Sequence, residues 1–114
     1  MFYKKGGKMR LCTLRETPIY TKMVNAFFNE DEKGDLHVYV AKHAEEGDVV
    51  PHSEGCRKLR YARPGMGKRG GVRVIYYRQV AKEIIHLLII YAKAKQEHIP
   101  AHLLKAIVKE LNND

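Results

Sequence analysis

The residues best suited to chemistry in this 114-residue chain are basic and lie in its C-terminal half. Between Arg57 and Arg78 there are eight basic residues and no acidic ones, whereas eight of the thirteen acidic residues lie between Glu30 and Glu54. A formal charge of +8 attracts polyanions, and an arginine guanidinium binds phosphate oxygens through paired hydrogen bonds. Because the charge is segregated rather than spread evenly, it indicates a nucleic-acid-binding surface.

Alternation along three predicted strands, at residues 56–63, 72–80 and 84–93, brings several of these side chains onto one face. If the strands pair in sequence order, one surface carries Lys58, Arg60, Arg73, Tyr91 and Lys93. Cations gathered in this way repel one another, so the cluster lowers stability unless an anion relieves it. We interpret these five residues as a candidate catalytic site for a phosphodiester.

The reaction that such a set can promote is attack of an RNA 2′-hydroxyl on the adjacent phosphate. Arg60 and Arg73 would stabilise the charge that grows on the phosphoryl oxygens. Either Lys58 or Lys93 would accept the hydroxyl proton, and Tyr91 would stack on a base or donate a proton to the leaving oxygen. None of the three strands contains a carboxylate, which argues against a two-metal nuclease, and we expect no metal or cofactor.

Other basic residues of the same half are expected to bind RNA without taking part in catalysis: Arg57, Arg63, Lys68, Arg69 and Arg78. The glycines at 65, 67 and 70 match GxGxxG, but VRVIYY follows them, and a dinucleotide site needs a helix there. Residues 64–71 are therefore predicted to form a hairpin loop with Lys68 and Arg69 at its tip. His98 and His102 have no cysteine or carboxylate partner at ligand spacing, so they do not indicate a metal site.

The elements that position these residues are predicted from hydrophobic periodicity. Residues 10–16 alternate as a strand, and Thr17-Pro18 begins a helix that runs to Phe28, where NEDEKGD interrupts it. A second helix follows through Leu36 and His43 to Gly47, and after the three strands Ile99-Pro100 opens a last helix. The order β-α-α-β-β-β-α predicts an α+β fold with helices against one antiparallel sheet. Residues 1–9 are expected to form a flexible basic tail and residues 10–114 a single domain.

The cellular setting is predicted from what the sequence lacks. Cys12 and Cys56 are too few for a disulfide framework and indicate a reducing compartment. The first residues contain no apolar signal region, and the longest apolar run, residues 84–91, is far shorter than the ~18 residues that span a bilayer. We therefore expect a cytoplasmic protein with no membrane partner.

Three segments resemble the RelE/HigB superfamily of bacterial toxins, most closely its HigB-like branch: RETPIYTKMV, GDVVPHSEGCRKLRYARPGMGKRGGVRVIYYR and LLIIYAK. The resemblance covers residues 16–111 and implies a microbial-RNase-like fold. It also implies a metal-independent endoribonuclease that enters the ribosomal A site and cleaves translated mRNA. Carried over residue by residue, it matches Lys58 and Arg60 on one strand, Arg73 in GVR, and Tyr91 and Lys93 in YAK. His52 and Ser53 depart from the branch, which is richer in glycine there.

The resemblance implies partners as well. A helix-turn-helix antitoxin of the HigA type neutralises such toxins, and the pair represses its own operon, so operator DNA is reached only through the antitoxin. Lys68 and Arg69 fit a role in gripping rRNA or the message. Two alternatives stay open: a non-catalytic nucleic-acid-binding protein, and a ParE-like inhibitor of gyrase on the same fold. The cluster that contains Arg73 and Tyr91 favours the nuclease.

Overall fold

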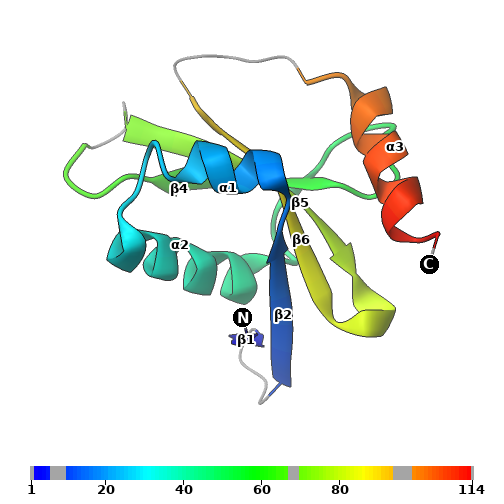
Figure 1. Cartoon of the computed structure of the whole chain (residues 1–114), viewed down its shortest axis with the longest axis horizontal. Coiled ribbons are helices and arrows are strands. Elements are labelled where there is room, and N and C mark those ends of the chain that lie inside the picture. Colours follow the sequence, from blue (N-terminus) through cyan, green and yellow to red (C-terminus); the bar gives the residue numbers. More distant parts are fainter. Residues whose placement is uncertain (1, 6–9, 67–69, 94–98, 114) are drawn as a thin grey trace.

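The computed structural model describes residues 2–5, 10–66, 70–93 and 99–113. Its elements, drawn in Figure 1, are β1 (Phe2–Lys5), β2 (Arg10–Glu16), α1 (Pro18–Val24), α2 (Glu30–His43), β3 (Asp48–Val49), β4 (Arg57–Ala62), β5 (Gly71–Gln79), the short 3₁₀ helix η2 (Val80–Lys82), β6 (Ile84–Ala92) and α3 (Ala101–Leu111). The predicted α+β class is confirmed. No helix among the described residues is long and apolar enough to cross a membrane.

The strands form one six-stranded sheet in the order β1-β2-β6-β5-β4-β3. All described neighbours pair antiparallel except β2 and β6, which run parallel with Thr13 opposite Ile84. The prediction of a purely antiparallel sheet is therefore wrong, and the sheet is mixed. The error has a physical origin, because alternating side chains look the same in both kinds of pairing and the hydrogen-bond direction leaves no trace in the pattern.

Two short strands were not predicted, so the expected element order is matched only in part. β1 pairs with β2 at one edge, and its residues fall within the segment for which we expected no regular structure. β3 contains only Asp48 and Val49, which pair with Lys58 and Arg57 at the other edge. Segments of two to four residues are too short for a periodicity to identify. The division of the chain into a tail and a single domain remains a prediction.

The start of α1 agrees with the sequence prediction, whereas the end of α1 and the start of α2 do not. The Thr17 side chain accepts a hydrogen bond from the Tyr20 amide at 3.1 Å, and Pro18 occupies the first turn. α1 then ends at Val24, earlier than predicted. α2 begins at Glu30, within the segment that we expected to be a break. There Asn29 and Glu32 form a reciprocal capping box at 2.8 and 2.9 Å, and the acidic first turn suits the helix dipole.

The larger core lies between one face of the sheet and helices α1 and α2. Tyr20 and Val24 of α1 and Leu36 and Val40 of α2 are fully buried in it. The sheet contributes the alternate residues Leu59, Val72, Val74 and Ile90. Burying a large apolar side chain stabilises a fold by roughly 1.5–3 kcal/mol, so this layer fixes which face of β4, β5 and β6 turns away from α1 and α2.

The opposite face of the sheet is covered in part by α3, which lies apart from α1 and α2 in Figure 1. Leu104 and Val108 of α3 pack with Ile75 and Leu88 in a second core. The pairing of β5 with β6 is shifted between Ile75 and Tyr76, so that Leu88 is the extra residue of a bulge. The Thr17 hydroxyl donates to the Leu88 carbonyl at 2.7 Å, which satisfies a backbone group at the bulge. β6 is therefore buried along most of its length.

Candidate active site

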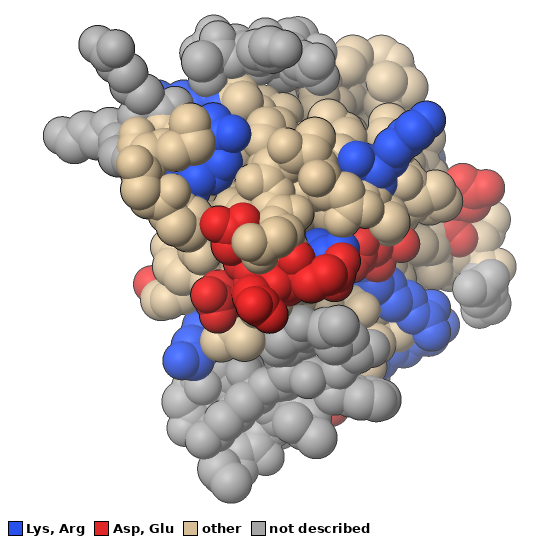
Figure 2. Space-filling model, turned by 60° about the vertical axis from the view of Figure 1, so that its left-hand side comes forward, with Lys and Arg blue, Asp and Glu red and all other residues tan. Residues whose placement is uncertain are grey.

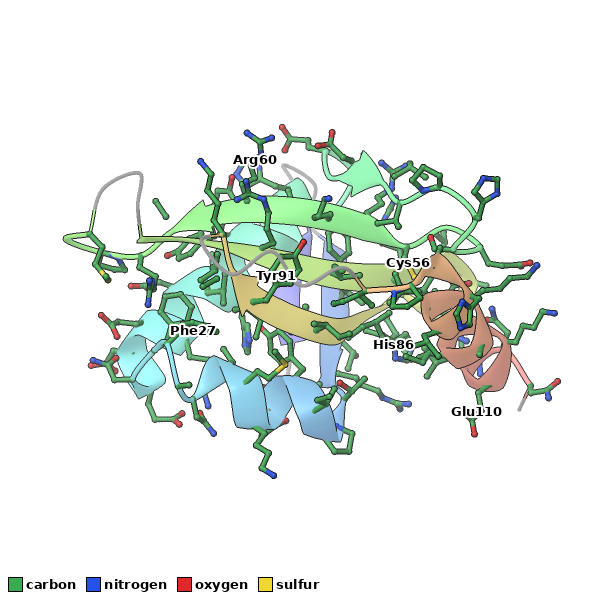
Figure 3. All side chains as sticks on the ribbon, turned by 90° about the horizontal axis from the view of Figure 1, so that it is seen from above. Phe27, Cys56, Arg60, His86, Tyr91 and Glu110 are labelled. Carbon is green, nitrogen blue, oxygen red and sulfur yellow. The ribbon has the colours of Figure 1, made fainter. Side chains whose placement is uncertain are left out.

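Three of the predicted site residues form a row across the sheet on the face that turns away from α1 and α2. Arg60 of β4 pairs with Arg73 of β5, and Arg73 pairs with Tyr91 of β6. Arg60 is exposed, whereas Arg73 and Tyr91 are half-buried. In Figure 3, Arg60 and Tyr91 lie toward one end of the sheet, and His86, Cys56 and Glu110 lie toward the other. The row thus places two guanidinium groups and one phenol side by side.

Tyr91 stands at the boundary between this row and the second core. Its ring packs against the cluster that contains Leu104 and Val108. Burial raises the pKa of the Tyr91 hydroxyl, and the nearby Arg73 guanidinium lowers it by a smaller amount. Because burial has the larger effect, the phenol keeps its proton throughout the neutral range. A protonated hydroxyl beside two cations is suited to donate a proton rather than to accept one.

Lys93 lies beside the row, two residues after Tyr91 along the chain. The Lys93 amide donates to the Gly71 carbonyl at 2.9 Å, which carries the pairing of β5 with the chain of β6 one step further. Its exposed side chain lines a surface hollow of about 410 Å³ together with Arg60, Tyr61, Ala62 and Gly71. We call this the Arg60–Lys93 hollow. Among the described residues that line it, two are cationic and none is acidic, so it is suited to an anion.

Lys58 lies on the same face as Arg60, two residues earlier on β4, but its neighbours differ. Its cross-strand partners are Ile75 on one side and Asp48 on the other. The Lys58 side chain lines a second hollow, of about 240 Å³, whose other lining residues are Tyr39, His43, Glu46, Asp48, Leu59 and Arg60. We call this the Tyr39–Asp48 hollow. Arg60 lines both hollows.

Three of the residues predicted to bind RNA are held by contacts elsewhere in the fold. Arg57 donates to the carbonyls of Glu45 at 3.2 Å and Gly47 at 2.8 Å, at the turn after α2. Arg78 forms an ion pair with Glu45 at 3.3 Å. Arg63 donates to the Gly70 carbonyl at 2.7 Å, and its guanidinium lies 5.2 Å from the centre of the Phe27 ring. The structure does not bring these residues to the row, and their RNA contacts remain a prediction.

The tip of the glycine-containing loop, with Lys68 and Arg69, lies outside the described residues, as does His98. At the base of the loop the Arg63 amide donates to the Gly70 carbonyl at 3.3 Å, and β5 begins at the next residue. The described part of the loop thus joins two antiparallel strands, and a strand follows the glycines. Within the described ranges no group of three His, Cys, Asp or Glu side chains is placed to hold a metal ion.

Charge is segregated on the surface as well as in the sequence. Figure 2 looks onto a face where Asp and Glu side chains form a band with Lys and Arg side chains at its borders. The first turn of α2 alone supplies Glu30, Asp31 and Glu32. These three acidic side chains belong to the layer of α1 and α2, whereas Arg60, Arg73 and Lys93 belong to the strands of the sheet, with Arg60 and Arg73 on its opposite face. An approaching polyanion is directed toward that second face.

Sequence reasoning missed the Tyr39–Asp48 hollow. Tyr39 and His43 are four residues apart on α2, and in the sequence the segment that contains them indicated only a helix. Their ring centres lie 4.4 Å apart, and Tyr39 also meets Tyr61 of β4 at 5.2 Å. An aromatic pair at helical spacing is the only signal in the sequence, and it does not tell packing from binding.

The sequence matches no known family model. The architecture is similar to a solved structure of the E. coli toxin RelE, an arginine double mutant in the free state. The TM-score is 0.56 and the identity 13%, and the match covers 85% of this chain and 96% of that one. The chain has a RelE-like fold. At this identity the RelE-like fold is shared while the activity is a separate question, because one fold can carry several functions.

Proposed function

We propose that this protein is the toxin of a type II toxin–antitoxin system and that it cleaves translated mRNA in the ribosomal A site. The observation that supports this most directly is the row Arg60–Arg73–Tyr91 across three strands, with Lys93 lining the adjacent hollow. Two cations directly opposite each other on a sheet destabilise the fold. A bound phosphate would remove that repulsion and would use both guanidinium groups.

The cleavage proceeds by attack of the RNA 2′-hydroxyl. A lysine, Lys93 or Lys58, accepts the hydroxyl proton as the 2′ oxygen bonds to phosphorus. Arg60 and Arg73 stabilise the additional negative charge on the phosphoryl oxygens. The bond from phosphorus to the 5′ oxygen breaks, and Tyr91 supplies the proton that this oxygen takes up. The products are a 2′,3′-cyclic phosphate and a free 5′-hydroxyl.

No step of this scheme uses a metal ion. The nucleophile belongs to the substrate, and side-chain cations take the place that metal ions hold in two-metal nucleases. Tyr91 fits the role of the acid because burial raises the pKa of its hydroxyl. The ribosome supplies the remaining requirement, which is to hold the message in a conformation suited to in-line attack.

The proposal includes the partners of such a toxin. A helix-turn-helix antitoxin of the HigA type would neutralise the protein, and the complex would bind operator DNA through the antitoxin alone. The ribosome and its mRNA would be the targets, approached through the basic face of the sheet and the loop that carries Lys68 and Arg69. A small helix-turn-helix reading frame beside the coding sequence is the genomic observation that tests the HigB-like assignment.

The decisive experiment uses purified protein and ribosomes programmed with a defined mRNA. We expect cleavage within the A-site codon, with 5′-hydroxyl ends that are labelled by polynucleotide kinase without prior phosphatase treatment. A message with a single 2′-deoxy nucleotide at the cut position should remain intact, and Arg73→Ala should abolish cleavage of the normal message. Cleavage of the 2′-deoxy message at an unchanged rate would overturn the mechanism.

Induction in cells separates the alternatives. Growth arrest with cuts inside translated codons supports the nuclease. Arrest with intact mRNA and an SOS response would indicate the ParE-like activity instead. Salt-dependent RNA binding without toxicity would indicate a plain nucleic-acid-binding protein.

A further inference from the structure

The Tyr39–Asp48 hollow lies immediately beside the proposed phosphate site and is not used by the chemistry described above. Its volume of about 240 Å³ is below the roughly 300–1,000 Å³ of pockets that take drug-sized molecules, so it admits a small planar group. Arg60 lines it on one side and lines the Arg60–Lys93 hollow on the other. A nucleotide whose phosphate contacts Arg60 therefore has a recess within reach of its base.

One wall of the hollow is aromatic. Tyr39 and His43 are half-buried, and their ring centres are 4.4 Å apart with an angle of 37° between the planes. The Tyr61 ring packs against the Tyr39 ring with their centres 5.2 Å apart, and the Phe28 ring meets Tyr61 edge-on with a centre-to-centre distance of 5.9 Å. This packing holds the Tyr39 ring in place before any ligand arrives. A fixed aromatic surface beside a cation is what a base stacks on.

The hollow also carries hydrogen-bond acceptors. The carboxylates of Glu46 and Asp48 are exposed at the hollow, and Glu46 also pairs with the Nδ1 atom of His43. Asp48 belongs to β3, which pairs only with Arg57 and Lys58. On its other side β4 pairs with β5 throughout, so among the described residues only its outer edge is without a strand partner from Leu59 onward. Since the Arg63 amide points toward Gly70, alternation directs the backbone groups of Arg60 outward, toward this open edge.

The mixed charge decides what kind of group fits. Two carboxylates repel a phosphate, so the phosphate belongs to the Arg60–Lys93 hollow, whose described lining residues include no acidic side chain. The same carboxylates accept hydrogen bonds from an exocyclic amino group. Adenine, cytosine and guanine carry such a group, whereas uracil does not.

We propose that the Tyr39–Asp48 hollow binds one nucleobase of the RNA, next to the phosphate at Arg60 and Arg73, and that it favours bases with an exocyclic amino group. Tyr39 stacks on the base, and Asp48 with Glu46 accepts from its amino edge. This inference rests on the proposed function, because it takes RNA as the substrate. In this proposal, residues of α2 and β3 determine which RNA base is preferred, and the row of Arg60, Arg73 and Tyr91 does not.

The test is NMR titration of the isotope-labelled full chain with inorganic phosphate and with the four nucleoside 3′-monophosphates. We expect at least one amino-bearing nucleotide to bind about fivefold or more tightly than 3′-UMP, and to shift the amide signals of Tyr39, His43 and Asp48. Asp48→Asn should bring that ratio close to one. Glu45→Gln is the matched control, because Glu45 is exposed and pairs with Arg78 outside the hollow, and it should leave the ratio unchanged.

A second pair of variants tests the stacking. Tyr39→Leu should weaken binding of all amino-bearing nucleotides about tenfold, whereas Tyr39→Phe should retain it, because the ring is kept. Thermal unfolding of both variants separates a loss of binding from a loss of fold. Equal binding by Tyr39→Leu and Tyr39→Phe would overturn the aromatic part of the proposal.

The same titration distinguishes a failure of the base site from a failure of the phosphate site. Shifts confined to Arg60 and Arg73, with equal affinity for all four nucleotides, would overturn the base site and leave the phosphate site standing. If phosphate does not bind at all, adenosine and uridine without phosphate become the probes. A shift of the Tyr39 and Asp48 signals by adenosine alone would then support the base site, and its absence would refute it.

Discussion

Arg73 lies directly across from Tyr91 on the paired strands β5 and β6, and the guanidinium and the phenol hydroxyl influence each other electrostatically. Burial against the second core raises the pKa of Tyr91 more than Arg73 lowers it. A tyrosine surrounded by water beside the same arginine would lose its proton more easily. The position of α3 therefore matters for the chemistry that we propose, because the core it forms keeps the phenol protonated.

Tyr91→Phe removes only the hydroxyl and leaves the ring in the second core. We expect cleavage of ribosome-bound mRNA to fall about 10²- to 10⁴-fold, the usual range for loss of a general acid, with thermal stability nearly unchanged. Tyr77→Phe is the matched control, since the Tyr77 hydroxyl accepts a hydrogen bond from Asn112 and lies outside the row. Equal activity of Tyr91→Phe and Tyr77→Phe would exclude Tyr91 as the acid.

Arg73→Gln should stabilise the protein while it abolishes cleavage. The substitution removes the repulsion between Arg60 and Arg73, which lie opposite each other on β4 and β5. We expect the free energy of unfolding to rise by about 0.5 kcal/mol at low salt, measured by urea denaturation, and the gain to shrink as salt screens the charges.

Arg78→Gln provides the comparison, because Arg78 forms an ion pair with Glu45 rather than facing another cation. This variant should show no gain at low salt. A lower stability of Arg73→Gln at low salt would mean that the two arginines do not strain the ligand-free protein.

Stability should decline as the pH falls below about 6.5, because two histidines are buried. Burial is the largest cause of the lowered pKa of both His37 and His86, from an ordinary value of 6.5. The unfolded chain therefore binds protons that the folded chain does not, and acid favours unfolding. The stabilisation is complete above pH 6.5 and is lost as the pH drops through the folded-state values.

Urea denaturation between pH 5 and pH 8 measures this dependence. His86 Nε2 lies 3.0 Å from Gln79 Oε1, so His86→Gln keeps a polar group there while removing the titration of His86. The variant should show a smaller dependence on pH, with the contribution of His37 remaining. His102→Gln, at an exposed position of α3, should leave the profile unchanged. A profile that stays flat in the unmodified protein would contradict the argument.

The parts of the fold that the sequence predicted are those decided by neighbouring residues. Thr17 and Pro18 fixed the start of α1, and β2 begins and ends where its alternation does. Alternation on β4 and β5 also placed Arg60 and Arg73 on one face, which the pairing of these two residues agrees with. Asn29 and Glu32 form a capping box that the sequence contained, but the cluster of charged residues around it was interpreted as a break.

The remaining features depend on contacts between distant segments. Nothing in the alternation of β2 and β6 tells parallel from antiparallel pairing, and nothing in IIHLLIIYA marks Leu88 as the bulged residue. The Tyr39–Asp48 hollow forms only when the end of α2, the two-residue β3 and the edge of β4 come together. The row of Arg60, Arg73 and Tyr91 was predictable because the pairing of neighbouring strands alone collects it, whereas the proposed base site was not.

Gly47, just after α2, tests how tightly the end of this helix is packed, and Gly34 inside α2 serves as the comparison. Gly47 is buried, and a Cβ atom there would overlap the Tyr76 hydroxyl and approach the Lys58 carbonyl to 3.1 Å. That hydroxyl donates to the Ala44 carbonyl at 2.6 Å and the Tyr76 side chain is fully buried, so it has little freedom to move. We expect Gly47→Ala to lower the free energy of unfolding by about 1–3 kcal/mol.

Gly34→Ala should have the opposite sign. Gly34 lies inside α2, and a Cβ atom there meets nothing within 4 Å, so alanine restricts the unfolded chain without a clash. We expect the free energy of unfolding to rise by roughly 0.5–1 kcal/mol in urea denaturation. Both substitutions add one methyl group near the same helix, so a gain in stability from Gly47→Ala as well would show that the contacts of Tyr76 do not restrict residue 47.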